Sequence, residues 1–311
     1  MFASLAFFLA AQGISIPLGK PPRVIEQPRA PIESAGPRWV SVCKDVDGQQ
    51  AWVTPAPPVR IHANTYEVGT CGISSILIVG DEGDILIDGG PEEAADLIAD
   101  NIQALGYRLT DVKYLLNSHE HSDHAGGLAK LQRLTGAQLV ASAAQAEVLR
   151  SGVPSKDDPQ FGVLKGFSPA RVDRIIANGE MVRLGNVAVF ATATPGHTEG
   201  ALTWHWGSCD GGICRQIVYA DSLTAVSAAS YRFTDHPLYV SAFRESIGRV
   251  AKLDCDILIS PHPGASQMPQ RFALGRPLLD PDACKVYAAT KAKELDDRLA
   301  KEATSAEQPK P

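Results

Sequence analysis

One short stretch, residues 117–127, constrains this chain more than any other feature. It reads Asn-Ser-His-Glu-His-Ser-Asp-His-Ala-Gly-Gly and follows the apolar run 112–116. A structural segment has no reason to crowd three histidines and a carboxylate at the end of a buried strand. Neutral imidazoles suit zinc, and a carboxylate beside them allows a second ion close by. The stretch therefore predicts a metal site.

Composition narrows the class of protein. The chain has 311 residues, of which 44% are hydrophobic, enough for one large core or two fused halves. The net charge is −6 and lysine and arginine do not cluster, which argues against nucleic acid and anionic membrane surfaces as partners.

Residues 1–11 are apolar and precede small residues, which is typical of a secretory signal, although no basic residue precedes the apolar run. We therefore expect a secreted or periplasmic protein with no stable membrane partner.

The cysteines agree with an oxidising compartment. Their number is six, and an even count beside a secretory signal predicts disulfides. Six cysteines allow fifteen pairings, between which the sequence alone does not choose. Proximity favours Cys209–Cys214, across the turn 210–212.

Four parts follow one another along the chain. We expect a signal peptide at 1–13, a proline-rich arm at 14–38, a catalytic domain at 39–302 and a disordered tail at 303–311. Residues 39–58 are rich in turn residues. β-Branched runs and helical stripes then alternate, which predicts an α/β fold whose sheets lie between helices. Residues 151–166 contain prolines and glycines without periodicity, which is typical of a mobile loop over a site.

Histidines recur where predicted strands end. Five of the eight lie in such loops: His119, His121, His124, His197 and His262. Loops at one edge of a sheet are where ligands converge. Two adjacent metal ions need about six protein ligands and a shared water. The five histidines and Asp123 supply that number, but their spacing does not divide them between two ions.

Four motifs together resemble one known family. They are 117–127, Pro-Gly-His-Thr at 195–198, Ala-Asp-Ser-Leu at 220–223 and Pro-His-Pro-Gly-Ala-Ser at 261–266. In this order they resemble the metallo-β-lactamase superfamily, and most of all the third subclass of the class B β-lactamases. The resemblance covers residues 40 to 300. Ser222 stands where the first two subclasses have cysteine, and His119 stands where the second has asparagine.

This resemblance implies a fold and a site. The fold is an αββα sandwich of two mixed sheets flanked by helices, and the cofactors are two Zn²⁺ per chain. The implied ligands are His119, His121 and His197 for the first zinc, and Asp123, His124 and His262 for the second. The implied disulfides are Cys43–Cys71, Cys209–Cys214 and Cys255–Cys284. We expect a monomer.

The resemblance also implies β-lactam hydrolysis, and with it antibiotic resistance. A hydroxide shared by the two zinc ions would open the lactam ring without a covalent acyl-enzyme. Asp123 would orient this nucleophile. The family implies that Ser222 and Thr224 bind the substrate carboxylate, and we add Gln160 and Tyr231 as further substrate contacts.

Two other functions stay open. If Asp221 bridged both ions, a lactonase or a glyoxalase-like thioester hydrolase would be favoured; otherwise Asp221 hydrogen-bonds a metal ligand or loop backbone. A non-catalytic metal-binding member is a further alternative. It is disfavoured because structural zinc sites close with four protein ligands, whereas three ligands per ion leave room for water and substrate. Glu120, between two ligands, is expected to point away from the metals.

Overall fold

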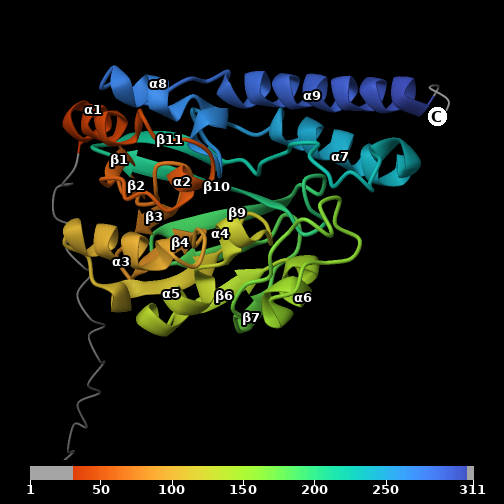
Figure 1. The fold of residues 1–311 in the computed structure, drawn as a ribbon. Helices are drawn as coiled ribbons and strands as arrows, with labels where there is room; N and C mark the ends of the chain where they lie inside the picture. Colours follow the sequence, from red (N-terminus) through yellow and green to blue (C-terminus); the bar gives the residue numbers. More distant parts are fainter. Residues whose placement is uncertain (1–30, 307–311) are drawn as a thin grey trace, which may run out of the picture.

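Two β-sheets form the centre of the molecule, which we describe from a computed structural model covering residues 31–306 (Figure 1). The first sheet has seven strands in chain order. They are β1 (Val59–His62), β2 (Thr65–Glu67), β3 (Ile76–Val79), β4 (Asp84–Ile87), β5 (Val112–Leu116), β6 (Gln138–Ala141) and β7 (Val172–Ile175). Strands β1 to β4 pair antiparallel, and β4 to β7 pair parallel, so the sheet is mixed.

The second sheet has five strands in the order β12-β11-β10-β9-β8. Their bounds are β8 (Met181–Leu184), β9 (Val187–Ala193), β10 (Leu202–Asp210), β11 (Ile213–Tyr219) and β12 (Ile257–Ile259). Only β11 and β12 pair parallel, through Ile217 opposite Ile257. This sheet is mixed as well.

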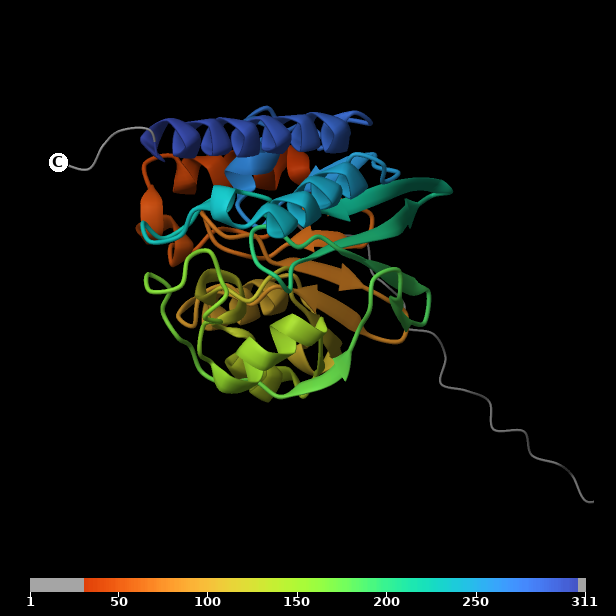
Figure 2. The ribbon, with the colours of Figure 1, turned by 90° about the vertical axis from the view of Figure 1, so that its right-hand side faces the viewer.

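Helices cover the outer faces of both sheets (Figures 1 and 2). On the first sheet lie α3 (Ala94–Ala104), α5 (Leu128–Thr135) and α6 (Ala143–Ser151). On the opposite side lie α1 (Ile32–Cys43), α7 (Pro237–Val250), α8 (Met268–Ala273) and α9 (Ala283–Ala306). The shorter helices are α2 (Gly48–Trp52), α4 (Ser122–Ala125), η1 (Leu109–Asp111), η2 (Phe233–Asp235) and η3 (Pro263–Ser266). The predicted αββα sandwich is confirmed. Among residues 31–306, no helix is long and apolar enough to cross a membrane.

The main core lies between the two sheets. Ile76, Ile78 and Ile85 of the first sheet meet Trp204 and Trp206 of the second, and all are almost fully buried. Complete burial of a large apolar side chain contributes roughly 1.5–3 kcal/mol. Smaller clusters lie under α3 and α5 and under α7 and α9. A rigid centre of this kind holds the loops at the sheet edge in fixed positions.

Both ends of the domain differ from the prediction. Helix α1 begins at Ile32, inside the range expected to be an extended arm, and Pro37 lies within it. Packing accounts for this helix, because Trp39 meets the edge of the Phe272 ring at 5.6 Å. Helix α2 likewise lies in the turn-rich stretch, and α9 runs to Ala306, past the expected end at 302. The predicted signal peptide, the rest of the arm and residues 307–311 lie outside the described residues.

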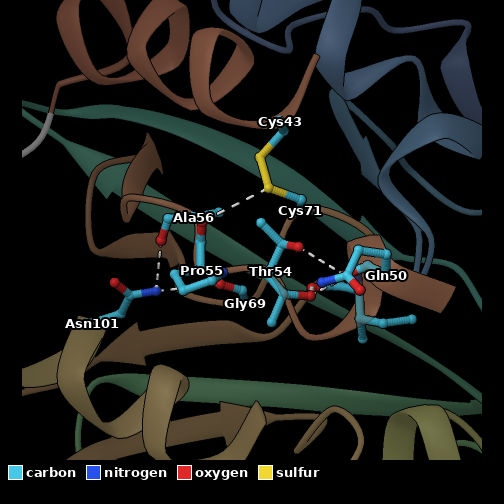
Figure 3. Close-up of a disulfide and its surroundings, with 10 residues drawn as sticks. Cys43, Gln50, Thr54, Pro55, Ala56, Gly69, Cys71 and Asn101 are labelled. Atoms are coloured by element: carbon cyan, nitrogen blue, oxygen red, sulfur yellow. Dashed lines mark hydrogen bonds between the residues drawn. A yellow bond between two sulfur atoms is a disulfide. The ribbon is translucent and has the colours of Figure 1, made fainter. Parts of the chain in front are cut away.

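All three disulfides implied by the family are confirmed: Cys43–Cys71, Cys209–Cys214 and Cys255–Cys284. A bridge typically contributes about 2–4 kcal/mol. Figure 3 shows that Cys43–Cys71 ties the end of α1 to the loop after β2, close to Pro55. The same loop continues to Ser74, whose backbone N donates to the Pro261 carbonyl at 2.8 Å. The first bridge therefore supports the backbone next to His262.

Candidate metal centre

The predicted ligands converge at one edge of the two sheets. Strand β5 ends at Leu116, and His119 and His121 follow it directly. The single turn α4 carries Asp123 and His124. His197 comes from the loop between β9 and β10, and His262 follows β12. Side chains from three separate parts of the chain thus meet in one place.

The first group consists of His119, His121 and His197. Their ring centroids are 4.8–4.9 Å apart, and one ligand atom of each lies within 4.8 Å of the others. All three are at most 6% exposed.

Each ring of this group is held through its other nitrogen. His119 Nδ1 lies 2.8 Å from Asp221 Oδ1, and His197 Nδ1 lies 3.0 Å from the carbonyl oxygen of Thr224. His121 Nε2 lies 3.0 Å from Asp158 Oδ2. An acceptor at one nitrogen fixes the proton there and leaves the other lone pair for a metal. His119 Nε2 is buried with no hydrogen-bond partner, which fits a ligand atom.

The second group consists of Asp123, His124 and His262. His124 Nε2 is 3.2 Å from Asp123 Oδ2 and 3.3 Å from His262 Nε2. His262 Nε2 is 3.5 Å from the same Asp123 oxygen. Tetrahedral zinc with bonds of about 2.0–2.1 Å needs ligand atoms about 3.3 Å apart. The three atoms therefore fit one ion, and His119 also lies within reach of Asp123 and His124.

The two groups differ in charge. Burial lowers the pKa of His119 and His197 well below the ordinary value, which favours neutral rings with a free lone pair. Burial also opposes protonation of His124, but the carboxylates of Asp123 and Asp88 outweigh it and raise the pKa of His124 to about 10. The carboxylates therefore favour positive charge at His124, whereas burial and the neighbouring His124 lower the pKa of His262 to about 4.

Asp88 supports this centre from below, a role that we did not predict. It follows β4 with φ +64°, and its carboxylate accepts hydrogen bonds from Ser118 N and Ser118 Oγ, both at 2.6 Å. Tyr219 donates to it at 2.7 Å, and His124 Nδ1 lies 3.5 Å away. Through its hydrogen bonds to Ser118 and Tyr219, the buried Asp88 carboxylate links the two sheets next to the predicted metal ligands.

Glu120 points away from the two groups, as predicted. Its carboxylate accepts from Thr198 Oγ1 at 2.8 Å and from Gly200 N at 3.0 Å. Burial raises its pKa to about 7. Glu120 therefore ties the segment carrying His119 and His121 to the loop carrying His197.

Four of the six predicted ligands, His121, Asp123, His197 and His262, line a cavity of about 630 Å³. Helix α2 contributes Trp52 to its wall, and the opposite wall includes Gln160 and Phe167. The expected position of residues 151–166 over a site is therefore confirmed; their mobility stays a prediction. Thr224 also lines the cavity, and its role in substrate binding stays a prediction.

Two of the predicted substrate contacts lie elsewhere. Ser222 is 4% exposed, and its hydroxyl is buried beneath the site without a hydrogen-bond partner. Tyr231 is absent from the cavity wall, and its ring stacks on His236 at 4.3 Å. Asp221 binds His119 through its side chain and belongs to neither ligand group, so a bridging position is not supported.

Comparisons with known proteins agree with this geometry. A sequence model of the metallo-beta-lactamase superfamily matches residues 68–262. The chain belongs to the metallo-β-lactamase superfamily. Among solved structures it is similar to MIM-2 metallo-beta-lactamase, with 49% identity and a TM-score of 0.82 over 86% of this chain and 98% of that one. It is also similar to MIM-1 from Novosphingobium pentaromativorans, with 46% identity and a TM-score of 0.84 over 86% and 99%.

The chain is also similar to a third solved structure and to two curated proteins. MEM-A1, a subclass B3 enzyme from a soil metagenome, is 44% identical with a TM-score of 0.78 over 82% of this chain and 99% of that one. A probable metallo-hydrolase of Burkholderia pseudomallei is 27% identical over 45% of this chain. A hydroxyacylglutathione hydrolase of Acidiphilium cryptum is 32% identical over 38% of this chain. The chain spans about half or less of these curated relatives, 49% and 38% of their lengths.

Proposed function

We propose that this chain is a zinc-dependent β-lactamase that binds two zinc ions per molecule. One observation carries the proposal: two groups of three candidate ligands lie side by side, and His121, Asp123, His197 and His262 of these groups line a single cavity. Each group leaves coordination positions for water and substrate, unlike a closed structural site. Similarity to MIM-2 and MEM-A1, both called metallo-beta-lactamases, gives the substrate class.

Side chains of this chain have distinct tasks in the proposed reaction. Zinc ions, when bound, polarise a carbonyl oxygen and lower the pKa of water near them. His119, His121 and His197 would hold the first ion, and Asp123, His124 and His262 the second. The Asp123 carboxylate, at the base of the cavity, would also orient the attacking water. Because the nucleophile is water, no side chain needs to form a covalent bond to the substrate.

The cavity suits a small substrate with a carboxylate. Thr224 lies on its wall, so we propose it as a hydrogen-bond donor to that carboxylate. The Ser222 hydroxyl is buried and is not on the cavity wall, so it would reach the carboxylate only if the loop after β11 shifted. Gln160 would contact the substrate from the opposite wall. Tyr231 is the weakest candidate because it packs against His236.

A chelator-controlled assay tests the proposal. The purified protein is given a chromogenic cephalosporin, a lactone and a glutathione thioester, each with and without a chelator. We expect chelator-sensitive cephalosporin hydrolysis that returns when zinc is added back. Turnover of the thioester with no cephalosporin hydrolysis would instead support the second candidate, a thioester hydrolase, which the hydroxyacylglutathione hydrolases among the relatives favour.

The compartment and the biological role belong to the same proposal. The three disulfides fit an oxidising compartment, and we propose a secreted or periplasmic monomer that protects its host from β-lactam antibiotics. Expression in a susceptible bacterium should raise the inhibitory concentration of a β-lactam, and an Asp123→Ala variant should not.

A further inference from the structure

The wall of the cavity opposite α2 touches a metal ligand through one buried contact. We define the pocket loop as residues 152–167, closed at its base where Phe167 N donates to the Gly152 carbonyl at 3.0 Å. Asp158 lies inside this loop, and its side chain is only 4% exposed. Its Oδ2 lies 3.0 Å from His121 Nε2, and the His121 side chain is 5% exposed. A loop that forms the cavity wall thus reaches into the metal centre.

The two oxygens of Asp158 have separate partners. Oδ1 accepts from Gln160 N at 2.7 Å, within the pocket loop. Oδ2 faces His121, and a carboxylate oxygen accepts, so the His121 proton is placed on Nε2. The Nδ1 lone pair is then free on the side of His119 and His197. One carboxylate therefore fixes both the shape of the loop and the tautomer of the ligand.

The rest of the pocket loop has few attachments near its tip. Ala228 N donates to the Pro159 carbonyl at 2.8 Å, directly beside Asp158. Val153, Phe161 and Val163 are exposed by 62%, 44% and 65%, so apolar burial does little to hold this part of the loop. The contact between Asp158 and His121 is therefore a main anchor of the loop on the metal side.

We propose that Asp158 is a positioning residue that presents Nδ1 of His121 to the metal and thereby couples metal binding to the order of the pocket loop. This inference rests on the proposed function, because it takes His121 as a ligand of a bound ion. Coupling of this kind is reciprocal. The carboxylate should strengthen metal binding, and bound metal should hold the loop that carries Gln160 against the cavity.

Asp158→Asn tests the tautomer, because asparagine has the same shape but cannot serve both partners. If its oxygen stays on Gln160 N, its amide donates toward His121 Nε2 and moves the histidine proton to Nδ1. If the amide flips, its N–H groups oppose the N–H of Gln160. Asp157→Asn is the matched control, since Asp157 is the exposed neighbour with the same charge.

Zinc affinity, measured by competition with a chelator, is the first readout. Replacing the hydrogen-bond partner of a metal ligand typically weakens metal binding about 10–100-fold. Asp158→Asn should therefore weaken zinc binding to the first group by this factor, and Asp157→Asn should leave it unchanged. The second readout is long-range ¹H–¹⁵N NMR of zinc-stripped protein above the pH at which ordinary histidines titrate. His121 should carry its proton on Nε2 in the wild type and on Nδ1 in Asp158→Asn, a change that a merely structural role would not produce.

The third readout needs no variant. Hydrogen exchange of residues 153–166 should slow when zinc is added to the stripped wild-type protein. Equal exchange with and without zinc, or equal zinc affinity in Asp158→Asn and the wild type, would overturn the inference while leaving the proposed function intact. Failure of the wild-type protein to bind zinc at all would overturn both.

Discussion

The two ligand groups lie side by side but are built differently. In the first group, His119, His121 and His197 do not hydrogen-bond one another, and each ring is held by a separate acceptor. In the second group, the nitrogen and carboxylate atoms of His124, His262 and Asp123 face one another at 3.2–3.5 Å. The three histidines of the first group are at most 6% exposed, whereas the His262 side chain is 38% exposed.

This difference separates two ways of making a metal site. The first group is preorganised, because acceptors in two loops, Asp221 and Thr224 after β11 and Asp158 in the pocket loop, set each ring before any ion arrives. The second relies on charge, since the carboxylates of Asp123 and Asp88 favour a cation between them. We therefore expect the first group to be sensitive to its hydrogen-bond partners and the second to changes in charge and in the backbone beneath it.

The largest effect is expected from the one histidine that lies within reach of both groups. His119→Ala should lower the metal content of both sites. It should reduce kcat/KM for a cephalosporin by more than about 100-fold, because loss of a ligand costs more than loss of the ligand's hydrogen-bond partner, which lowers affinity or activity by up to about 100-fold. His262→Ala should remove metal from the second group alone. Metal content by atomic emission and kcat/KM by absorbance check both statements.

His236→Ala is the control for these substitutions, since His236 stacks on Tyr231 and lies in neither group. It should keep full metal content and activity. If His262→Ala emptied both sites equally, the two groups would not be separable in the way the geometry indicates.

A smaller effect is expected at the partner of His119. Asp221→Asn should weaken zinc binding to the first group about 10–100-fold, because the Asp221 carboxylate orients Nδ1 of His119 at 2.8 Å. The second group should keep its ion. The measurement is chelator competition followed by metal analysis, with the exposed Asp254→Asn as control.

Asp221→Asn also distinguishes a β-lactamase from a lactonase or thioester hydrolase. If Asp221 bridged the two ions, its replacement would release metal from both groups together. That outcome would favour the lactonase or thioester hydrolase alternative over the β-lactamase.

The predicted metal ligands could be found from the sequence because they lie in short motifs at the ends of strands. His119 to His124 follow one buried strand, and His197 and His262 follow others, so strand ends alone brought the six ligands to one edge. The disulfide pairs and the division of the ligands between two ions came from resemblance to a family, not from spacing.

Residues that act through long-range contacts were missed for a physical reason. Asp158 lies in a loop without periodicity, and its partner His121 is 37 residues away. Trp52 lies on α2, whose five residues give too short a stripe to reveal a helix. Helix α1 was missed because Pro37 argued against it, while its packing on Phe272 is invisible in the sequence. The hydroxyl of Ser222, which the resemblance assigns to substrate binding, is buried, and this depends on how the loop after β11 folds.

The smallest effect on metal binding is expected from the backbone beneath the second group. Glu67 Oε1 accepts from Gly69 N at 2.8 Å and Ser75 N at 3.1 Å, which closes the loop that contacts Pro261 through Ser74. Burial raises the pKa of Glu67 to about 8, above the ordinary 4.5, despite these hydrogen bonds. A raised pKa in the folded state means that stability is greatest at low pH and falls as the pH rises toward about 8.

Glu67→Gln keeps the shape and the acceptor but cannot ionise, so it should remove this part of the pH dependence. Relative to the variant, the wild type should lose on the order of a few kcal/mol of unfolding free energy between weakly acidic and weakly alkaline pH. Denaturant unfolding at several pH values measures the difference, and Glu82→Gln, at an exposed position, should follow the wild type. Parallel curves for the wild type and Glu67→Gln would show that Glu67 does not titrate in this range. A further comparison is sensitive to the site: because the loop supports the backbone beside His262, rising pH should weaken metal binding to the second group in the wild type more than in Glu67→Gln.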